Sequence, residues 1–264
     1  LRFPGDRLGE RPRDRIEVDR RRRAPEPRRD ADVESLAAAD ERHEHVARHA
    51  ERLVEHVDKV DDVHHPIIRE AIRILDFKTP QIEITTLADI PSGTGLGSSG
   101  SFTTALLKAL YSHRRRLIHP NELAELACDI EMNKLGEPIG KQDQYIAAYG
   151  GVTCFTFHPD GTVDASPLQA SMETLFALED NLLLFFTGFS RSAGAVLADQ
   201  KTRTEQHDPE MIANLRYVKA LGLRSKDLLE SGDTAGFGEL MHEHWEHKRR
   251  RSKGMSNPQI DEWY

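Results

Sequence analysis

The chain has 264 residues, a formal net charge of -8 and a hydrophobic fraction of 38%, which suits one large domain or two small ones. Its acidic balance argues against nucleic-acid binding, its longest apolar run (Asn181 to Phe186) is too short to span a bilayer, and its two cysteines are too few for a disulfide framework. We see no signal peptide and therefore expect a cytoplasmic protein without nucleic-acid or membrane partners.

Residues 1–45 differ in composition from the rest of the chain. They are rich in charge, contain prolines and show no sustained apolar period. Such a segment cannot bury enough apolar surface to offset the entropy lost on ordering. We predict a charged, disordered or aberrant segment here.

Organised structure is expected to begin near residue 46. Apolar residues recur at helical spacing from Ile67 to Leu75 and predict a helix, with Pro66 tolerated in its first turn. The alternating, β-branched pattern of residues 82–90 predicts a strand. A glycine-rich loop follows, and a second helix is predicted after it, with an apolar stripe made of Phe102, Ala105, Leu106, Ala109 and Leu110.

The second half mixes helices and strands. A helix is predicted to begin at the N-cap Asn121 and to stop at Gly136. Residues 152–157 and the stretch from Thr162 predict a hairpin around the turn "HPDG". Residues 181–188 predict a buried strand, and residues 211–231 and 234–251 predict two helices. The whole is an α+β layout.

The loop "IPSGTGLGSSGS", residues 90–101, has the composition of a phosphate-binding loop. Its part "GLGSSG" satisfies the dinucleotide pattern G-x-G-x-x-G, but the following helix leads into another helix where a dinucleotide fold needs a strand ending in an acid. The Walker pattern fails because no lysine follows the glycines. A third kind of phosphate loop fits this stretch better.

The stretch "PSGTGLGSS", Pro91 to Ser99, resembles the second motif of the GHMP sugar kinases, P-x-x-x-G-L-G-S-S. The run "IEMNKLGEPIGKQDQYIAAYGG" is similar to the branch that phosphorylates D-glycero-D-manno-heptose 7-phosphate at its anomeric carbon. The later runs "NLLLFFTGFSRSA", "LMHEHWEHK" and "GMSNPQIDE" resemble the same branch. The resemblance implies a truncated, two-lobed GHMP kinase fold. Its N-terminal lobe, ribosomal protein S5 domain 2-like, is expected at 46–185, and a partial ferredoxin-like C-terminal lobe at 186–264.

The resemblance also implies the ligands, which are ATP, Mg²⁺ and a sugar phosphate. Backbone N–H groups of the loop and the N-terminus of the following helix suit a triphosphate. The loop residues implied in nucleotide binding are Pro91, Gly93, Gly95, Leu96, Gly97, Ser98, Ser99, Gly100 and Ser101.

Individual roles follow from the same resemblance. Ser99 and Glu131 are implied as magnesium ligands, and Asp143 as the catalytic base. Lys141 is expected either to lower the pKa of Asp143 or to touch phosphate. Arg191 and Lys248 are candidates for the 7-phosphate of the substrate, because a phosphorylated sugar needs cations.

Two further motifs of the family are not found in the sequence. Residues 1–45 do not match its first strand and glycine-rich loop, and the third glycine-rich motif is absent before Tyr264. We therefore expect missing strands and an incomplete ATP site. Two alternatives stay open, namely another GHMP sugar kinase such as a fucokinase, and a non-catalytic nucleotide-binding remnant.

Overall fold

The computed structural model describes residues 55–76, 82–88, 93–185, 187–188, 193–251 and 256–264. The chain divides into two compact units, Leu1–Asp89 and Ile90–Tyr264. The predicted segment 1–45, Pro91 and Arg191 lie outside the described residues. The predicted lobe boundary at 185/186 stays a prediction.

The described part of the first unit is small. It holds the 3₁₀ turn η1 (Val60–Asp62) and helix α2 (Pro66–Ile74), with Pro66 in the first turn as the sequence predicts. The extended stretch 82–88 alternates as predicted at its start, since Ile82 and Ile84 are buried and Glu83 is exposed. It is nevertheless not a strand, because among the described residues no other strand pairs with it.

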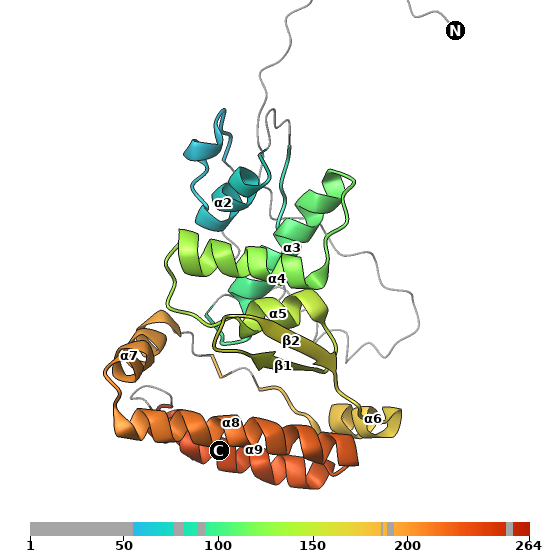
Figure 1. Ribbon diagram of the computed structural model, residues 1–264, viewed down its shortest axis with the longest axis vertical. Coiled ribbons are helices and arrows are strands. Elements are labelled where there is room, and N and C mark those ends of the chain that lie inside the picture. The colour runs from blue at the N-terminus through green and yellow to red at the C-terminus, as the bar shows by residue number, and fades with distance from the viewer. Residues whose placement is uncertain (1–54, 77–81, 89–92, 186, 189–192, 252–255) are drawn as a thin grey trace, which may run out of the picture. The chain divides into compact units, whose positions relative to one another are not determined.

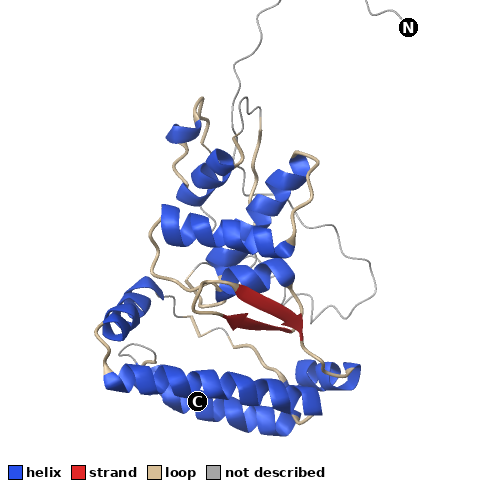
Figure 2. Ribbon diagram, viewed as in Figure 1, coloured by secondary structure: helices blue, strands red, loops and turns tan. Residues whose placement is uncertain are grey.

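The second unit is mostly helical, with one small sheet (Figures 1 and 2). Its elements in chain order are α3 (Ser98–His113), α4 (Pro120–Cys128), the π-helical turn η2 (Asp129–Lys134), α5 (Gln142–Tyr149), β1 (Thr153–Phe157), β2 (Val163–Pro167), α6 (Met172–Asn181), α7 (Ala193–Glu205), α8 (Pro209–Ser231), α9 (Thr234–Arg251) and α10 (Pro258–Trp263). This mixture of helix and sheet confirms the α+β class.

Several predicted elements are confirmed. Strands β1 and β2 pair antiparallel in a register that sets Thr153 opposite Pro167 and Phe157 opposite Val163. The turn between them contains Gly161 at φ +88°, a left-handed value that favours glycine. Helices α8 and α9 occupy the two predicted C-terminal segments, and Gly232 separates them at φ +83°.

The predicted strand at 181–188 is wrong. Residue Asn181 ends α6, and the apolar side chains of residues 182–185 are 51–79% exposed in a stretch without strand pairing. Hydrophobicity alone identified this run as a strand. A strand also requires a neighbouring backbone to hydrogen-bond with, and none of the described residues supplies it.

Two local predictions also need correction. His119, rather than Asn121, caps α4, because its Nδ1 accepts a hydrogen bond from the Asn121 N–H at 3.2 Å. The buried face of α3 includes Thr103, Leu107 and Leu110, whereas the predicted stripe members Ala105 and Ala109 are exposed. Gly100 and Thr103 therefore lie on the buried face of the helix, which the hydrophobic pattern of the sequence did not predict.

The core around α4, α5 and the hairpin is aromatic. Tyr145, 1% exposed, packs with Ala124 and Cys128, stacks on Tyr149 with ring centroids 6.1 Å apart and meets Phe155 edge-on at 5.7 Å. This packing fixes the helix that carries Asp143. No helix in the described part of the chain combines the length and apolar character that crossing a membrane requires.

Candidate active site

The glycine loop leads into α3 with a backbone that only glycine adopts easily. Gly93, Gly95 and Gly97 have φ values of +77°, +79° and +68°. Gly97 is the N-cap of α3, so the first N–H groups of the helix follow it directly. This loop and helix N-terminus are the predicted phosphate-binding segment, and their geometry suits an anion.

Ser99 and Glu131 lie in contact, although they are 32 residues apart in the chain. The Ser99 hydroxyl donates a hydrogen bond to Glu131 Oε2, and the amide of Gln144 donates to Glu131 Oε1 at 3.1 Å. Glu131 is 1% exposed and sits in the π-helical turn η2. Such turns inside helices are frequent at functional sites. Three elements, α3, η2 and α5, thus meet at one buried carboxylate.

Asp143 packs against the glycine loop and α3. A methyl group at Gly97 would come within 3.2 Å of Asp143 Cγ, and one at Gly100 within 3.1 Å of Asp143 Cβ. The missing side chains of both glycines thus allow this close approach. Burial, and then the negative charge of Glu131, raise the pKa of the Asp143 carboxyl above its ordinary value. The raised pKa and the proximity to Glu131 are features of a functional carboxylate pair.

The ammonium of Lys141 pairs with Glu125. It donates to both oxygens of Glu125, at 2.7 and 2.9 Å, and to the Gly161 carbonyl at 3.0 Å. The pKa of Asp143 is raised, so the predicted lowering by Lys141 is wrong. The lysine instead ties α4 to the hairpin turn, and contact with phosphate stays a prediction.

Glu125 and Tyr145 complete this second cluster. The Tyr145 hydroxyl donates to Glu125 Oε1 and lies 3.2 Å from Asn121 Oδ1. Burial raises the pKa of Glu125, but the hydrogen bonds from Lys141 and Tyr145 outweigh burial and leave it below its ordinary value. Sequence reasoning missed Glu125 and Gln144. Gln144 stands beside Asp143 in the printed run, but no spacing rule marked either residue.

The oxygen cluster fits a hard divalent cation. Mg²⁺ prefers oxygen ligands such as carboxylates and hydroxyls, and it keeps several waters. The Ser99 hydroxyl and the Glu131 carboxylate are such ligands and lie within hydrogen-bonding distance of each other. The two groups come from different helical segments and are held by packing. A cation binding between these oxygens would take the place of their hydrogen bond.

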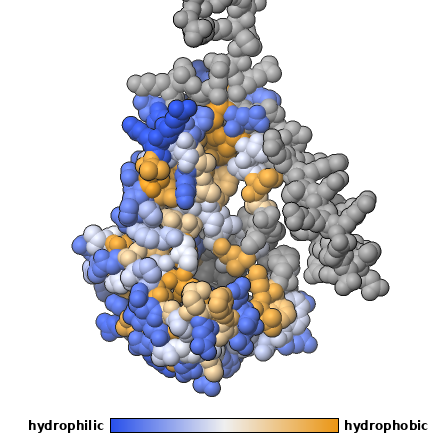
Figure 3. All heavy atoms as spheres, turned by 90° about the vertical axis from the view of Figure 1, so that its right-hand side faces the viewer, coloured by the Kyte–Doolittle hydropathy of each residue, from blue (hydrophilic) through white to orange (hydrophobic). Residues whose placement is uncertain are grey.

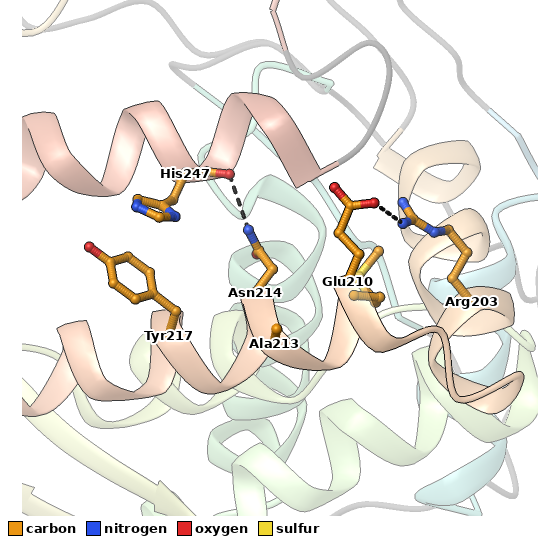
Figure 4. Close-up of a pocket in the computed structure, with 7 residues that line it drawn as sticks. Arg203, Glu210, Ala213, Asn214, Tyr217 and His247 are labelled. Carbon is orange, nitrogen blue, oxygen red and sulfur yellow. Dashed lines mark hydrogen bonds and ion pairs between the residues drawn. The ribbon is translucent and has the colours of Figure 1, made fainter.

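A separate pocket of about 390 Å³ lies among α7, α8 and α9. Two polar pairs line it, as Figure 4 shows: Arg203 with Glu210, and the Asn214 amide nitrogen with the carbonyl of His247. The buried Asn214 Oδ1 has no hydrogen-bond partner among the described residues. Lys248, predicted to contact a phosphate, is half-buried in α9 next to His247. Its role stays a prediction.

Comparison with solved structures identifies the fold. The crystal structure of a D-glycero-D-manno-heptose 1-phosphate kinase from Bacteroides thetaiotaomicron superposes with a TM-score of 0.63 and 24% identity, covering 91% of this chain and 65% of that one. This chain therefore shares the fold of that crystal structure over most of its length. Residues 66–151 match the family of GHMP kinases N terminal domain, so the chain carries a GHMP kinase N-terminal domain and the predicted resemblance is confirmed.

Curated relatives agree with this family. The D-glycero-alpha-D-manno-heptose 7-phosphate kinase of Campylobacter jejuni is 26% identical over 203 residues, 77% of this chain and 59% of that protein. The bifunctional fucokinase/GDP-fucose pyrophosphorylase of Arabidopsis thaliana is 28% identical over 185 residues, 69% of this chain and 17% of that protein. The chain thus spans about three fifths of the heptose kinase relative, at 59%.

Proposed function

We propose that this chain carries the phosphoryl-transfer site of an ATP-dependent sugar kinase acting on the anomeric hydroxyl of D-glycero-D-manno-heptose 7-phosphate. The observation that supports the proposal most is the contact between Ser99 and Glu131 at the start of α3, with Asp143 packed against Gly97 and Gly100. These groups are a cation-binding oxygen pair and a base, beside a loop suited to phosphates.

Each group has a defined part in the transfer. The loop from Gly93 to Ser101 binds the triphosphate, and Ser99 and Glu131 would hold Mg²⁺, which would neutralise charge on the phosphates. The Asp143 carboxylate takes the proton of the anomeric hydroxyl. That oxygen bonds to the γ-phosphorus as the bond to the β–γ bridging oxygen breaks, and ADP leaves.

The substrate assignment rests on the named relatives. The heptose 7-phosphate kinase of Campylobacter jejuni supports a 7-phosphorylated heptose, whereas the fucokinase of Arabidopsis thaliana supports L-fucose. Lys248 and Arg191 are the proposed cations for a sugar phosphate. We favour the heptose because the alignment with the heptose kinase covers more of this chain, 77% against 69%.

A substrate panel tests the proposal. The 264-residue chain is incubated with ATP, Mg²⁺ and one sugar at a time: heptose 7-phosphate, unphosphorylated heptose, L-fucose or galactose. ADP release and phosphorus NMR should show an anomeric phosphate formed from heptose 7-phosphate. Transfer to L-fucose in its place would make the fucokinase alternative correct. Nucleotide binding without transfer to any sugar would support the non-catalytic remnant.

A further inference from the structure

Gln144 is a buried polar residue for which the proposed chemistry gives no role. It follows Asp143 in the first turn of α5 and is 1% exposed. Burying a primary amide is unfavourable unless its donors and acceptors find partners. The partners of this amide therefore indicate what it does.

The nitrogen of the amide faces the buried carboxylate. Gln144 Nε2 donates to Glu131 Oε1 at 3.1 Å, while the Ser99 hydroxyl donates to Oε2. Each carboxylate oxygen of Glu131 thus accepts one hydrogen bond, and the two donors lie on different helices. An ionised carboxylate only accepts hydrogen bonds, so the amide must present its N–H₂ side here. Gln144 and Ser99 together fix the orientation of Glu131.

The amide oxygen of Gln144 takes no part in this contact with Glu131. Gln144 Oε1 is buried and has no hydrogen-bond partner among the residues that the structure describes. It cannot turn toward Glu131, because two acceptors would then face each other. A buried acceptor without a donor is costly, so a donor from a bound molecule is the expected partner. Waters that a divalent cation retains are such donors.

We propose that Gln144 is a positioning residue of the cation site: its N–H holds the Glu131 carboxylate toward Ser99, and its carbonyl oxygen accepts a hydrogen bond from a water of the bound cation. This inference rests on the proposed function, because it takes Ser99 and Glu131 as the residues that hold the cation. Hydrogen-bond partners that orient metal ligands in this way contribute to metal affinity.

The test uses Mn²⁺ in place of Mg²⁺, together with a non-hydrolysable ATP analogue. Electron paramagnetic resonance reports free Mn²⁺ in the presence of the unchanged chain and of Gln144→Met, which keeps the side-chain length but removes both polar groups. Mn²⁺ affinity should fall by about 10- to 100-fold, the usual effect of removing such a partner. Binding of the analogue in EDTA should stay unchanged.

Two further variants sharpen the result. Gln142→Met alters an exposed glutamine in the same helix turn and should leave Mn²⁺ affinity unchanged. Gln144→Asn keeps the amide on a stem one methylene shorter, which cannot keep the contact with Glu131, so it should lose affinity as Gln144→Met does. It also provides a second test if the methionine variant fails to fold.

The outcomes separate this inference from the proposed function. Unchanged Mn²⁺ affinity in folded Gln144 variants would overturn the inference, and so would an equal loss of metal-free nucleotide binding, which marks a purely structural role. The absence of Mn²⁺-dependent nucleotide binding by the unchanged chain would overturn it as well. If the Gln144 variants lose Mn²⁺ affinity but no sugar is phosphorylated, the proposed function fails and the inference stands.

Discussion

Asp143 and Glu131 are two neighbouring acids in different environments. Glu131 is buried and receives hydrogen bonds from Ser99 and Gln144, whereas Asp143 lies at the surface of α5 beside the glycine loop. Partial burial of its carboxyl against the glycine loop, and then the charge of Glu131, raise the pKa of Asp143. A carboxylate with a raised pKa holds a proton more readily and is therefore a better general base, provided that it is still ionised at the working pH.

The raised pKa predicts how stability responds to replacing Asp143. The folded state holds the proton of Asp143 to a higher pH than the unfolded chain does, so folding loses free energy as pH rises through the window between the two pKa values. At neutral pH the ionised carboxylate is thus destabilising. Asp143→Asn should unfold at a higher temperature at neutral pH, and its advantage should vanish in acid, below the ordinary pKa.

Calorimetry of both chains across this pH range measures the difference. Asp227→Asn, on the exposed surface of α8, is the control for a change of net charge. An unfolding temperature for Asp143→Asn equal to that of Asp227→Asn at every pH would contradict the environment assigned to Asp143.

At the scale of elements, the approach of α5 to α3 depends on Gly100. A methyl group there would lie 3.0 Å from the backbone carbon of Asp143 and 3.1 Å from the nitrogen of Gln144. Gly100→Ala should therefore destabilise the chain, because overpacking costs about 1–3 kcal/mol, more than the about 0.5–1 kcal/mol gained by replacing a helical glycine. Urea unfolding measures the difference.

Gly222 supplies the matched control for this substitution. It lies within α8, and a methyl group there would meet no atom within 4 Å. Gly222→Ala should stabilise the chain by about 0.5–1 kcal/mol through helix propensity alone. A stabilising effect of Gly100→Ala similar to that of Gly222→Ala would show that α3 and α5 do not pack as described.

The cluster of Lys141, Glu125 and Tyr145 joins α4, α5 and the hairpin turn. Tyr145→Phe keeps the buried ring but removes the hydroxyl that donates to Glu125. We expect a loss of about 1 kcal/mol in the free energy of unfolding, the usual worth of such a hydrogen bond. Tyr149→Phe, which keeps the stacked ring pair, is the control. An unchanged free energy of unfolding in Tyr145→Phe would show that this hydroxyl does not stabilise the fold.

Sequence patterns predicted elements better than contacts between them. The hairpin and the two C-terminal helices were predictable because turn residues and helical periodicity act locally. The prediction of a strand at 82–90 was wrong for the described residues 82–88. A strand needs a pairing partner that is distant in the sequence, and a local pattern does not show whether one is present. At the site, motif resemblance singled out Ser99, Glu131 and Asp143. The positions of Lys141 and Gln144 depend on how α4, η2 and α5 pack, which no local pattern records.

At the scale of the whole molecule, the described surface includes a run of exposed apolar side chains at residues 182–185. Figure 3 shows hydrophobic residues reaching the surface among hydrophilic ones. Leu183 and Leu184 are each 79% exposed and Phe185 is 77% exposed, in one continuous run. Contiguous exposed apolar patches promote association or mark binding surfaces.

This exposure predicts dye binding and self-association. The 264-residue chain should enhance the fluorescence of anilinonaphthalene sulfonate, and the double variant Leu183→Ser with Leu184→Ser should reduce that signal and the tendency to aggregate. Light scattering during concentration gives the second readout. A double variant that binds as much dye as the unchanged chain would mean that residues 182–185 are covered in solution.

The most direct test of the central claim is γ-phosphoryl transfer from ATP to heptose 7-phosphate in a single turnover, compared between the unchanged chain and Asp143→Asn. We predict transfer by the unchanged chain, a rate about 10²- to 10⁴-fold lower in Asp143→Asn, as expected for loss of a general base, and equal nucleotide affinity in both. Equal transfer rates in the two chains, or no transfer in either, would contradict the assignment of Ser99, Glu131 and Asp143 to a phosphoryl-transfer site.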